Sequence, residues 1–493
     1  MDKIKEENLY SAFKAKDTRF DGRFFVGVSS TGIYCRPVCR AKLPKPDNCT
    51  YYPTAAAAEQ AGYRPCLLCR PELAPGTFVS KQISATDASD ALAFRAIRLL
   101  EENSGSGQSL EFFSEKLGCT SRHLRRVFTA KYHVTPVQYL QTCRLLLAKN
   151  LLTDTSLSIL EVAMTSGFGS LRRFNDLFKK QYHLTPAALR KQGIRKPNRS
   201  GNIELALSYR PPYPWRQILD FLEKRAIPGV ELVQNESYMR TVRFKTEKHG
   251  ELRGWIRVGH VSRKNTLSVN VSAPLLPVLP QILAKVRHLF DLYCEPESVY
   301  EVLSPMNTIR PHLCKPGTRL PGCFDAFELI VRAILGQQIT VKAARTLAER
   351  FVRSFGTPVD TQIVGLTYTF PFPEDIISLK GEISEHLGPL GIISARSKCI
   401  LTLAREYIQK DIDFSLSAQP EIEMKKLLAI PGIGNWTAQY IAMRTMGWTD
   451  AFLETDAGVK NALSPLTPEE MLKMSEIWRP WRSYAVINLW NSL

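Results

Sequence analysis

The stretch that most constrains the fold is the segment 427–460, LLAIPGIGNWTAQYIAMRTMGWTDAFLETDAGVK. Its apolar residues break at a Pro-Gly-Ile-Gly turn that contains Gly432 and Gly434, and a second helix is expected to begin near Asn435. Two glycines around one apolar residue make a tight turn and leave backbone N–H groups bare at a helix N-terminus, which is a cradle for a phosphate. Asp456 follows the second helix, beside the start of another expected helix. Two core helices joined by a Pro-Gly turn are the alternative interpretation.

This pattern resembles the helix-hairpin-helix of base-excision DNA glycosylases. In that family the hairpin grips the DNA backbone and a downstream aspartate does the chemistry. The resemblance therefore implies DNA contacts at Gly432, Gly434 and Thr437, and a catalytic carboxylate at Asp456.

The second half of the chain extends this resemblance. Residues 203–290 alternate in short apolar runs around one expected helix near 215–225, which predicts an antiparallel sheet with helices packed on it, and helical periods dominate from residue 298. Both parts resemble the AlkA-type 3-methyladenine DNA glycosylase II over essentially their full length. The matching phrases are YRPPYPW, RLPGCFDAFELIVRAILGQQIT, the hairpin itself and WRPWRSYAVINLW.

The glycosylase resemblance implies a mechanism. The target base must leave the stack and enter a pocket, because its glycosidic bond is unreachable in the duplex. Asp456, as a carboxylate, would stabilise the oxocarbenium-like sugar and orient or deprotonate the attacking water. A base methylated at a ring nitrogen is cationic and is attracted to aromatic faces, which the resemblance places at Trp436, Tyr440 and Trp490. The alternative is that these three are only core aromatics.

Several departures from the family matter. Gln338, followed by Ile339, stands where relatives often carry an apolar wedge that fills the gap left by the flipped base, and Ala457 stands where some relatives have an aromatic. Hairpin glycosylases that also cut the strand place a lysine two residues after the second glycine, whereas this chain has Trp436, so we expect base release without strand cleavage. No cysteine follows Cys399, which excludes the iron–sulfur cluster of some hairpin glycosylases.

Paired cysteines dominate the N-terminal part. Cys35 and Cys39 form a C-x3-C pair, and Cys66 and Cys69 form a C-x2-C pair. Four cysteines so paired predict one tetrahedral zinc site in a reducing compartment; buried unliganded cysteines are the alternative. The surroundings are basic and include Arg36 and Arg40, which we expect to meet DNA phosphates.

The phrases FVGVSSTGIYCRPVCRAKLPKPDN and AGYRPCLLCRPE resemble the N-terminal domain of the Ada adaptive-response family. That domain repairs DNA methylphosphotriesters by taking the methyl group irreversibly onto one zinc-bound cysteine, which corresponds to Cys35. Zinc keeps the sulfur as the nucleophilic thiolate. Methylating one of four thiolates changes the charge of the site from −2 to −1, so repulsion from DNA phosphates falls and DNA binding should tighten.

A repeat with an offset of 50 residues follows: RHLRRVF and YHVTP of the first copy match RRFNDLF and YHLTP of the second. Each copy places arginines on the helix after a small-residue turn, as a helix-turn-helix requires. The pattern resembles the AraC-type DNA-binding domain, with two such units joined by a long helix at about residues 136–152. The expected DNA-contacting arginines are Arg122, Arg125, Arg172 and Arg173. Solvated basic helices are the alternative.

Charge supports a nucleic-acid partner. The formal net charge is +18, and residues 1–200 carry 31 Lys and Arg against 17 Asp and Glu. The N-terminus lacks the apolar core of a signal peptide, no apolar run approaches a membrane span, and eleven cysteines without framework spacing fit a reducing cytoplasm. We expect a cytoplasmic monomer that binds alkylated and operator double-stranded DNA, contacts RNA polymerase and no membrane, and holds one zinc ion.

The predicted fold class is a multidomain α+β protein with a zinc-thiolate domain, an all-α double helix-turn-helix, a small antiparallel-sheet α+β domain and an all-α helix-hairpin-helix glycosylase domain. The predicted segments are 1–76, 77–192, a linker at 193–202, 203–297 and 298–493. The predicted function is excision of alkylated bases combined with methyl transfer that switches on transcription. One alternative is a transcription regulator whose glycosylase half is only a DNA-binding relic; a second keeps the zinc module as pure structure.

Overall fold

The computed structural model describes residues 3–76, 88–192 and 202–493 and divides into two compact units. The first unit comprises residues 1–211, 261–287 and 292–295, and the second comprises residues 212–260, 288–291 and 296–493. The predicted linker, residues 193–202, lies outside the described residues except for Asn202. No helix in the described ranges is both long enough and apolar enough to cross a membrane.

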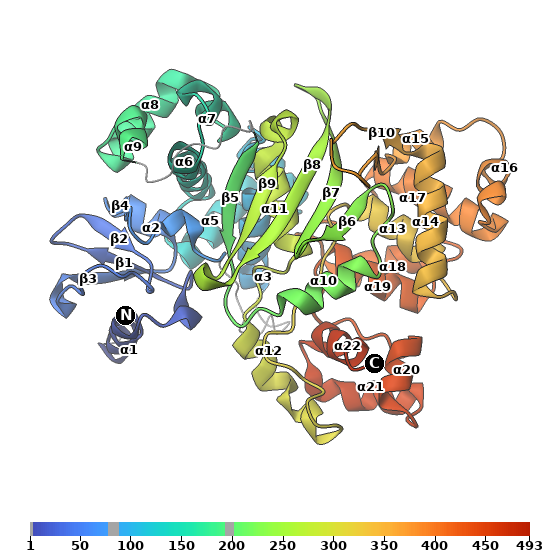
Figure 1. Cartoon of the computed structure of the whole chain (residues 1–493). Coiled ribbons are helices and arrows are strands. Elements are labelled where there is room, and N and C mark those ends of the chain that lie inside the picture. Colours follow the sequence, from blue (N-terminus) through green and yellow to red (C-terminus); the bar gives the residue numbers. More distant parts are fainter. Residues whose placement is uncertain (1–2, 77–87, 193–201) are drawn as a thin grey trace. The chain divides into compact units, whose positions relative to one another are not determined.

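The first unit begins with a four-stranded sheet in the order β3-β1-β2-β4 (Figure 1). Strand β2 pairs parallel with β4, with Tyr34 opposite Pro65. Cys35 follows Tyr34 and Cys66 follows Pro65, so this register brings the two cysteines to the same end of the paired strands. The elements are α1 (Lys3–Ala15), β1 (Phe25–Val28), β2 (Ile33–Cys35), β3 (Cys49–Tyr52), α2 (Ala55–Gln60) and β4 (Arg64–Pro65).

The helices that follow confirm the 50-residue repeat. The third helix of the first copy, α5, and its counterpart α8 end at His133 and His183, both in the left-handed conformation, with φ of 59° and 55°. Helix α6 joins the two copies and is two residues longer than predicted. The helices are α3 (Ala88–Glu102), α4 (Leu110–Lys116), α5 (Ser121–Tyr132), α6 (Pro136–Asp154), α7 (Ile159–Thr165), α8 (Leu171–Tyr182) and α9 (Pro186–Lys191).

A buried carboxylate joins the cysteine-bearing sheet to these helices. Glu59 of α2 is 4% exposed and accepts hydrogen bonds from the hydroxyls of Tyr34 (3.0 Å), Thr142 of α6 (2.8 Å) and Tyr182 of α8 (3.3 Å). Burial raises the pKa of Glu59 to about 8, because the ionised form loses its hydration. One side chain therefore connects the strand that ends in Cys35 with both the joining helix and the second helix-turn-helix.

A second connection starts beside Cys69. Arg70 donates to both carboxylate oxygens of Asp154, the last residue of α6, at 2.9 and 2.8 Å, and to Glu72 at 2.9 Å. Lys149 of α6 is almost fully buried and donates to the other oxygen of Glu72 at 2.6 Å. The first unit closes with β5 (Ile203–Ser208) paired antiparallel with β9 (Thr266–Val271).

The second unit contains the antiparallel strands β6 (Glu231–Gln234), β7 (Ser237–Thr246) and β8 (Gly250–Val261), in which β7 lies between the other two (Figure 1). Helices build the rest of the unit around an apolar core that includes Ile334, Phe351, Leu403, Leu427 and Ile441. The helices that frame the site are α10 (Trp215–Glu223), α13 (Ala326–Leu335), α14 (Val341–Phe355), α17 (Ser394–Gln409), α18 (Pro420–Leu428), α19 (Asn435–Thr445), α20 (Ala457–Leu463) and α22 (Arg482–Trp490).

The remaining short elements are α11 (Leu279–Leu289), α12 (Pro296–Leu303), α15 (Pro373–Ile377), α16 (Ile383–Leu387), α21 (Pro468–Ser475) and the strand pair β10 (Thr357–Pro358) and β11 (Tyr368–Thr369). The predicted fold class is confirmed: a cysteine cluster, a doubled helix-turn-helix, antiparallel strands and a helical domain with a helix-hairpin-helix follow one another along the chain. The second helix of the hairpin begins at Asn435, as predicted.

Candidate functional site

The Asp456 carboxylate is held by four N–H donors. It caps the N-terminus of α20, where its Oδ1 accepts from the backbone N–H groups of Gly458 (2.8 Å) and Val459 (3.1 Å). Two indoles complete the set: Trp490 Nε1 donates to Oδ1 at 2.8 Å, and Trp436 Nε1 donates to Oδ2 at 3.0 Å. The helix terminus and the two indoles together fix the orientation of the carboxylate.

Gly458, two residues after this aspartate, is a glycine for a steric reason. A Cβ on Gly458 would lie 2.8 Å from Cδ1 of Trp490, closer than side-chain atoms pack. Only glycine at this position lets the indole of Trp490, on the last turn of α22, reach Asp456.

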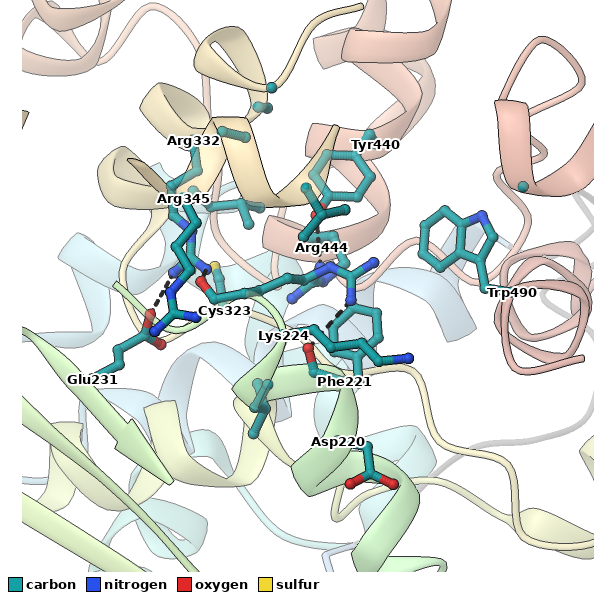
Figure 2. A pocket seen from close by; sticks show the side chains of 18 of the residues that line it. Asp220, Phe221, Lys224, Glu231, Cys323, Arg332, Arg345, Tyr440, Arg444 and Trp490 are labelled. Carbon is teal, nitrogen blue, oxygen red and sulfur yellow. Dashed lines mark hydrogen bonds and ion pairs between the residues drawn. The ribbon is translucent and has the colours of Figure 1, made fainter. Parts of the chain in front are cut away.

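The predicted pocket aromatics line one cavity of about 1290 Å³, together with Asp456. Trp436 and Tyr440 are one turn apart on α19 and their rings stack, with centroids 5.2 Å apart and planes 4° apart. Trp490 lies 6.4 Å from Tyr440, and Phe221 of α10 stacks on Trp490 at 6.3 Å (Figure 2). The structure thus brings together the three aromatics that the sequence singled out and adds Phe221.

Sequence reasoning missed two arginines in the same cavity. Arg444 donates from Nη1 to the hydroxyl of Tyr440 at 2.8 Å, and its guanidinium carbon lies 4.9 Å from the ring centroid of Phe221. Arg225, just after α10, lies 3.9 Å from the same ring centroid. Arg444 is four residues after Tyr440, so the spacing of one helical face offered a signal for it. No comparable local signal existed for Arg225.

These cations change the ionisation of their neighbours. Burial alone would raise the pKa of Tyr440, but Arg444, Arg225 and Arg332 outweigh it, so the pKa of this phenol lies below its usual value. Burial lowers the pKa of Arg225 to about 10, and Arg444 and Arg332 add to the effect by charge repulsion. The cavity therefore has a positive local potential.

The hairpin has the predicted geometry at its glycines. Gly432 has φ +93°, a left-handed conformation that favours glycine, whereas Gly434 is the N-cap of α19 with φ −91°. Both are exposed, and a Cβ on Gly434 would meet no heavy atom of the described chain within 4 Å. Glycine at 434 is thus not required by this chain's own packing, and it leaves space for an external group to approach the backbone.

The side chain of Thr437, a predicted DNA-binding residue, is buried, and its contact with DNA stays a prediction. Thr437 is 3% exposed, and its hydroxyl accepts a hydrogen bond from Gln337 Nε2 at 3.0 Å. The same amide nitrogen donates to the carbonyl of Gly432 at 2.8 Å. Gln337 therefore ties the loop between α13 and α14 to the hairpin, and the next residue, Gln338, is exposed with a left-handed φ of +54°.

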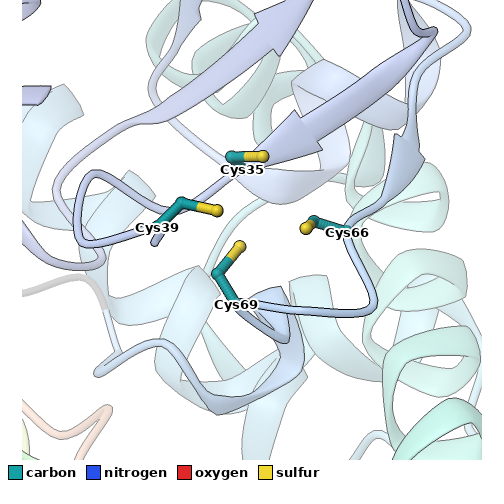
Figure 3. Close-up of side chains that lie close together, drawn as sticks. All are labelled: Cys35, Cys39, Cys66 and Cys69. Atoms are coloured by element: carbon teal, nitrogen blue, oxygen red, sulfur yellow. The ribbon is translucent and has the colours of Figure 1, made fainter. Parts of the chain in front are cut away.

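The four predicted cysteine ligands converge (Figure 3). Their sulfur atoms all lie within 4.8 Å of one another. Tetrahedral zinc–thiolate bonds of about 2.3 Å place the sulfurs about 3.8 Å apart, so the cluster fits a zinc ion. Cys49 is separate, with its thiol directed to the carbonyl of Lys45 at 3.4 Å.

Arg36 is a structural residue of this cluster rather than an exposed phosphate ligand. Its side chain is 12% exposed and forms an ion pair with Asp21, and its backbone N–H and Nη1 donate to the sulfur and the carbonyl of Cys69 at 3.3 and 3.1 Å. The contact of Arg36 with DNA stays a prediction, and its side chain is engaged within the cluster in this conformation. Arg40 is exposed and stays a candidate.

The predicted arginines of the helix-turn-helix units face solvent. On α5 and α8 the apolar face is buried by residues such as Phe128 and Phe178, while the arginines lie on the other face. The exposed set is Arg122, Arg125, Arg172 and Arg173.

Four protein families match successive parts of the chain. They are "Metal binding domain of Ada" over residues 8–72, "Helix-turn-helix domain" over 113–192, "AlkA N-terminal domain" over 204–325 and "HhH-GPD superfamily base excision DNA repair protein" over 331–477.

Similar proteins match either nearly the whole chain or a part of it. The chain is 34% identical to a "Probable bifunctional transcriptional activator/DNA repair enzyme AlkA" of Mycobacterium tuberculosis, over 99% of this chain and 96% of that protein. It is 36% identical to "DNA-3-methyladenine glycosylase 2" of Escherichia coli, over 58% of this chain and 95% of that protein. A Bacillus subtilis "Bifunctional transcriptional activator/DNA repair enzyme AdaA" is 28% identical over 40% of this chain and 88% of that protein.

Proposed function

The chain belongs to the family of bifunctional transcriptional activator/DNA repair enzymes of the AlkA type, in which an Ada-type zinc module and a helix-turn-helix precede a glycosylase, and from this premise we propose how its two sites act. The glycosylase site excises alkylated bases, such as 3-methyladenine, from double-stranded DNA by hydrolysis. The cysteine cluster takes a methyl group from a DNA methylphosphotriester. Residues 1–76, 77–192, 203–297 and 298–493 are the segments that we assign to these activities and to DNA binding.

The observation that carries the glycosylase proposal is the Asp456 carboxylate at the wall of an aromatic cavity. Oδ1 already accepts three N–H groups, whereas Oδ2 accepts only Trp436 within the described residues. A carboxylate oxygen has two lone-pair directions, so Oδ2 is the atom that faces the sugar and the attacking water.

The reaction then proceeds in two stages. The C1′–N bond breaks, its electron pair goes to the base, and the positive charge that develops on the sugar is stabilised by Asp456. Water attacks C1′ and gives a proton to the Asp456 carboxylate, from which it passes to solvent. Trp436 and Trp490 have two functions: their rings bound the cavity, and their N–H groups hold the carboxylate.

We assign DNA contacts to backbone groups of Gly432 and Gly434 at the hairpin. Gln338 is the residue that fills the gap left by the flipped base: it is exposed at a loop that Gln337 ties to the hairpin. A polar wedge can hydrogen-bond the base opposite the lesion, which an apolar one cannot.

A base-release assay tests the assignment of Asp456. Asp456→Asn keeps the shape but removes the charge, and we expect single-turnover release from methylated DNA to fall about 100-fold or more. Asp220→Asn is the matched control, because Asp220 lines the same cavity but pairs with Arg216 at the surface. Equal effects of the two changes would contradict the proposal.

Trp436 stands at the position where strand-cutting hairpin glycosylases carry a lysine, so we propose that the enzyme releases the base without cutting the strand. No cysteine follows Cys399, so we propose that it works without an iron–sulfur cluster. Borohydride trapping on alkylated DNA checks this. A covalent protein–DNA adduct that disappears in Lys460→Ala would show that a lysine attacks the sugar instead.

For the cluster, we propose that Cys35, Cys39, Cys66 and Cys69 hold one zinc ion and that Cys35 accepts the methyl. Zinc, when bound, keeps the sulfurs as thiolates at neutral pH. The Cys35 sulfur attacks the methyl carbon, the C–O bond breaks, and its electron pair returns to the phosphate oxygen. The phosphotriester is uncharged, so the thiolate is not repelled at the attacked position.

Peptide mapping after exposure to methylphosphotriester DNA tests this assignment. Cys35 is 6% exposed, whereas Cys69 is partly exposed, so the identity of the methylated residue is informative. We expect one added methyl, on Cys35. A methyl on Cys69 or Cys39 alone would contradict the assignment.

The four exposed arginines of α5 and α8 support operator binding, and we propose that the methylated protein binds its operator as a monomer and contacts RNA polymerase. The alternative, a glycosylase half that only binds DNA, is disfavoured by the fully formed carboxylate site.

A further inference from the structure

We propose that Arg225 and Arg444 form a cationic wall of the base cavity that stabilises the electron pair left on the departing base. This role rests on the proposed glycosylase reaction and assigns catalytic work to two residues besides Asp456. It follows from how the charges around the cavity pair with one another.

Two further arginines at the cavity are neutralised. Arg332 forms ion pairs with Glu231 at 2.8 Å and with Glu328 at 2.9 Å, and Arg240 pairs with Glu328 at 2.5 Å. These four residues line the cavity and together carry no net charge.

Arg225 and Arg444 bond only to neutral groups among the described residues. Arg225 Nη1 donates to the carbonyl of Phe221 at 3.2 Å, while Arg444 donates to the Tyr440 hydroxyl at 2.8 Å and to the carbonyl of Gly322 at 2.9 Å. Asp220 in the cavity wall pairs with Arg216, and the other cations of the lining, Lys224, Lys315, Lys342 and Arg345, are exposed to solvent. Arg225 and Arg444 are therefore the two remaining positive charges that are not exposed, against the negative charge of Asp456. The lowered pKa of Tyr440 reports the same positive potential.

The two guanidiniums also occupy an aromatic face. Both lie over Phe221, and Arg444 lies between Tyr440 and Phe221, beside Trp490 (Figure 2). The face of Phe221 is therefore already engaged with the chain's own cations and is not free to attract a cationic base. Arg225 also lies 5.9 Å from the ring centroid of Trp490, so attraction of such a base falls mainly to Trp436.

The charge of the base decides what this wall does. Breaking the C1′–N bond moves an electron pair onto the base nitrogen, so a methylated cationic base leaves neutral, and a neutral base leaves with a negative charge. Fixed guanidiniums in the cavity wall stabilise that negative charge and disfavour entry of a cation. Removing one should therefore slow release of a neutral base far more than release of a cationic one.

The test uses the full-length protein and two duplexes of identical sequence, one with 7-methylguanine, which is cationic, and one with hypoxanthine, which is neutral. Single-turnover release rates are measured for the wild type, Arg225→Gln and Arg225→Lys. We expect the hypoxanthine-to-methylguanine rate ratio to fall about tenfold or more in Arg225→Gln, and to recover in Arg225→Lys, which keeps the charge. Arg444→Gln and Arg444→Lys provide the same comparison of rate ratios for the second guanidinium.

A role that is only structural would lower both rates together and leave the ratio unchanged, which would overturn the proposal. A ratio that Arg225→Lys fails to restore would also overturn it, as would a wild type that releases 7-methylguanine and no hypoxanthine. A wild type that releases neither base would also overturn this proposal, and one that in addition releases no 3-methyladenine from methylated DNA would refute the glycosylase assignment with it.

Discussion

At the scale of single residues, the approach of Trp490 to Asp456 depends on the absence of a side chain at Gly458. We predict that Gly458→Ala lowers base release about tenfold or more, because the new Cβ, 2.8 Å from the indole, displaces a donor to the carboxylate. Single-turnover release on methylated DNA measures it. Gly388→Ala is the control, since a Cβ there meets no described atom within 4 Å. Unchanged release in Gly458→Ala would show that the Trp490 bond is dispensable.

Spacing along the chain was enough to predict the cysteine pairs and the hairpin glycines, because each is a short local motif, and the role of Asp456 was predicted from the family resemblance. The burial of Arg36 could not be predicted, because it depends on Asp21, which sequence spacing does not place beside it. The burial of Thr437 could not be predicted for the same reason, since its partner Gln337 is 100 residues away. Phe221 and Arg225 were missed because α10 and α19 are brought together only by the fold.

At the scale of elements, Gln337 joins two loops that we assign to different tasks, base extrusion and backbone binding. We predict that Gln337→Ala slows base extrusion, because the loop that carries Gln338 loses its hydrogen bonds to the hairpin. The loss of two neutral hydrogen bonds is about 1–3 kcal/mol, or roughly 5- to 150-fold in the extruded population. A fluorescent base analogue next to the lesion reports extrusion.

Gln409→Ala, on the exposed end of α17, is the control for that experiment. Extrusion that is equally fast in the wild type and in Gln337→Ala would remove Gln337 from the mechanism.

The Glu59 network makes the first unit sensitive to pH. The folded-state pKa of about 8 lies above the ordinary value of 4.5 for an exposed glutamate, so the folded state binds this proton more tightly. The stability that Glu59 contributes is complete below about pH 4.5 and is lost as the pH rises through about 8. Glutamine cannot ionise, so we predict that Glu59→Gln reduces the decrease in the free energy of unfolding between about pH 4.5 and pH 8. The size of this effect is a few kcal/mol at most.

All seven tryptophans lie between residues 215 and 490, within the second unit, so tryptophan fluorescence does not report on the first. Hydrogen exchange of peptides from α6 and α8, measured from pH 5 to pH 9 after correction for the intrinsic exchange rate, reports it directly. A wild type and a Glu59→Gln variant whose protection changes in parallel would show that Glu59 does not titrate in this range.

At the scale of the whole molecule, the charge of residues 1–200 and the proposed change of the cluster from −2 to −1 predict a switch in DNA binding. Methylated protein should bind its operator more tightly than unmethylated protein, and both affinities should fall steeply with salt because phosphate contacts release counterions. Titrations of the two forms over a salt series measure this. Superimposed binding curves would refute the switch.

The central claim is that one chain carries two independent repair chemistries, one at Asp456 and one at Cys35. The most direct test incubates the wild type, Asp456→Asn and Cys35→Ser with the same methylated duplex DNA, then measures released bases by chromatography and the protein mass of each sample. The account predicts that Asp456→Asn gains a methyl on Cys35 but releases no alkylated base, and that Cys35→Ser releases the base without gaining a methyl. Loss of both activities in either variant, or a wild type that shows only one, would contradict it.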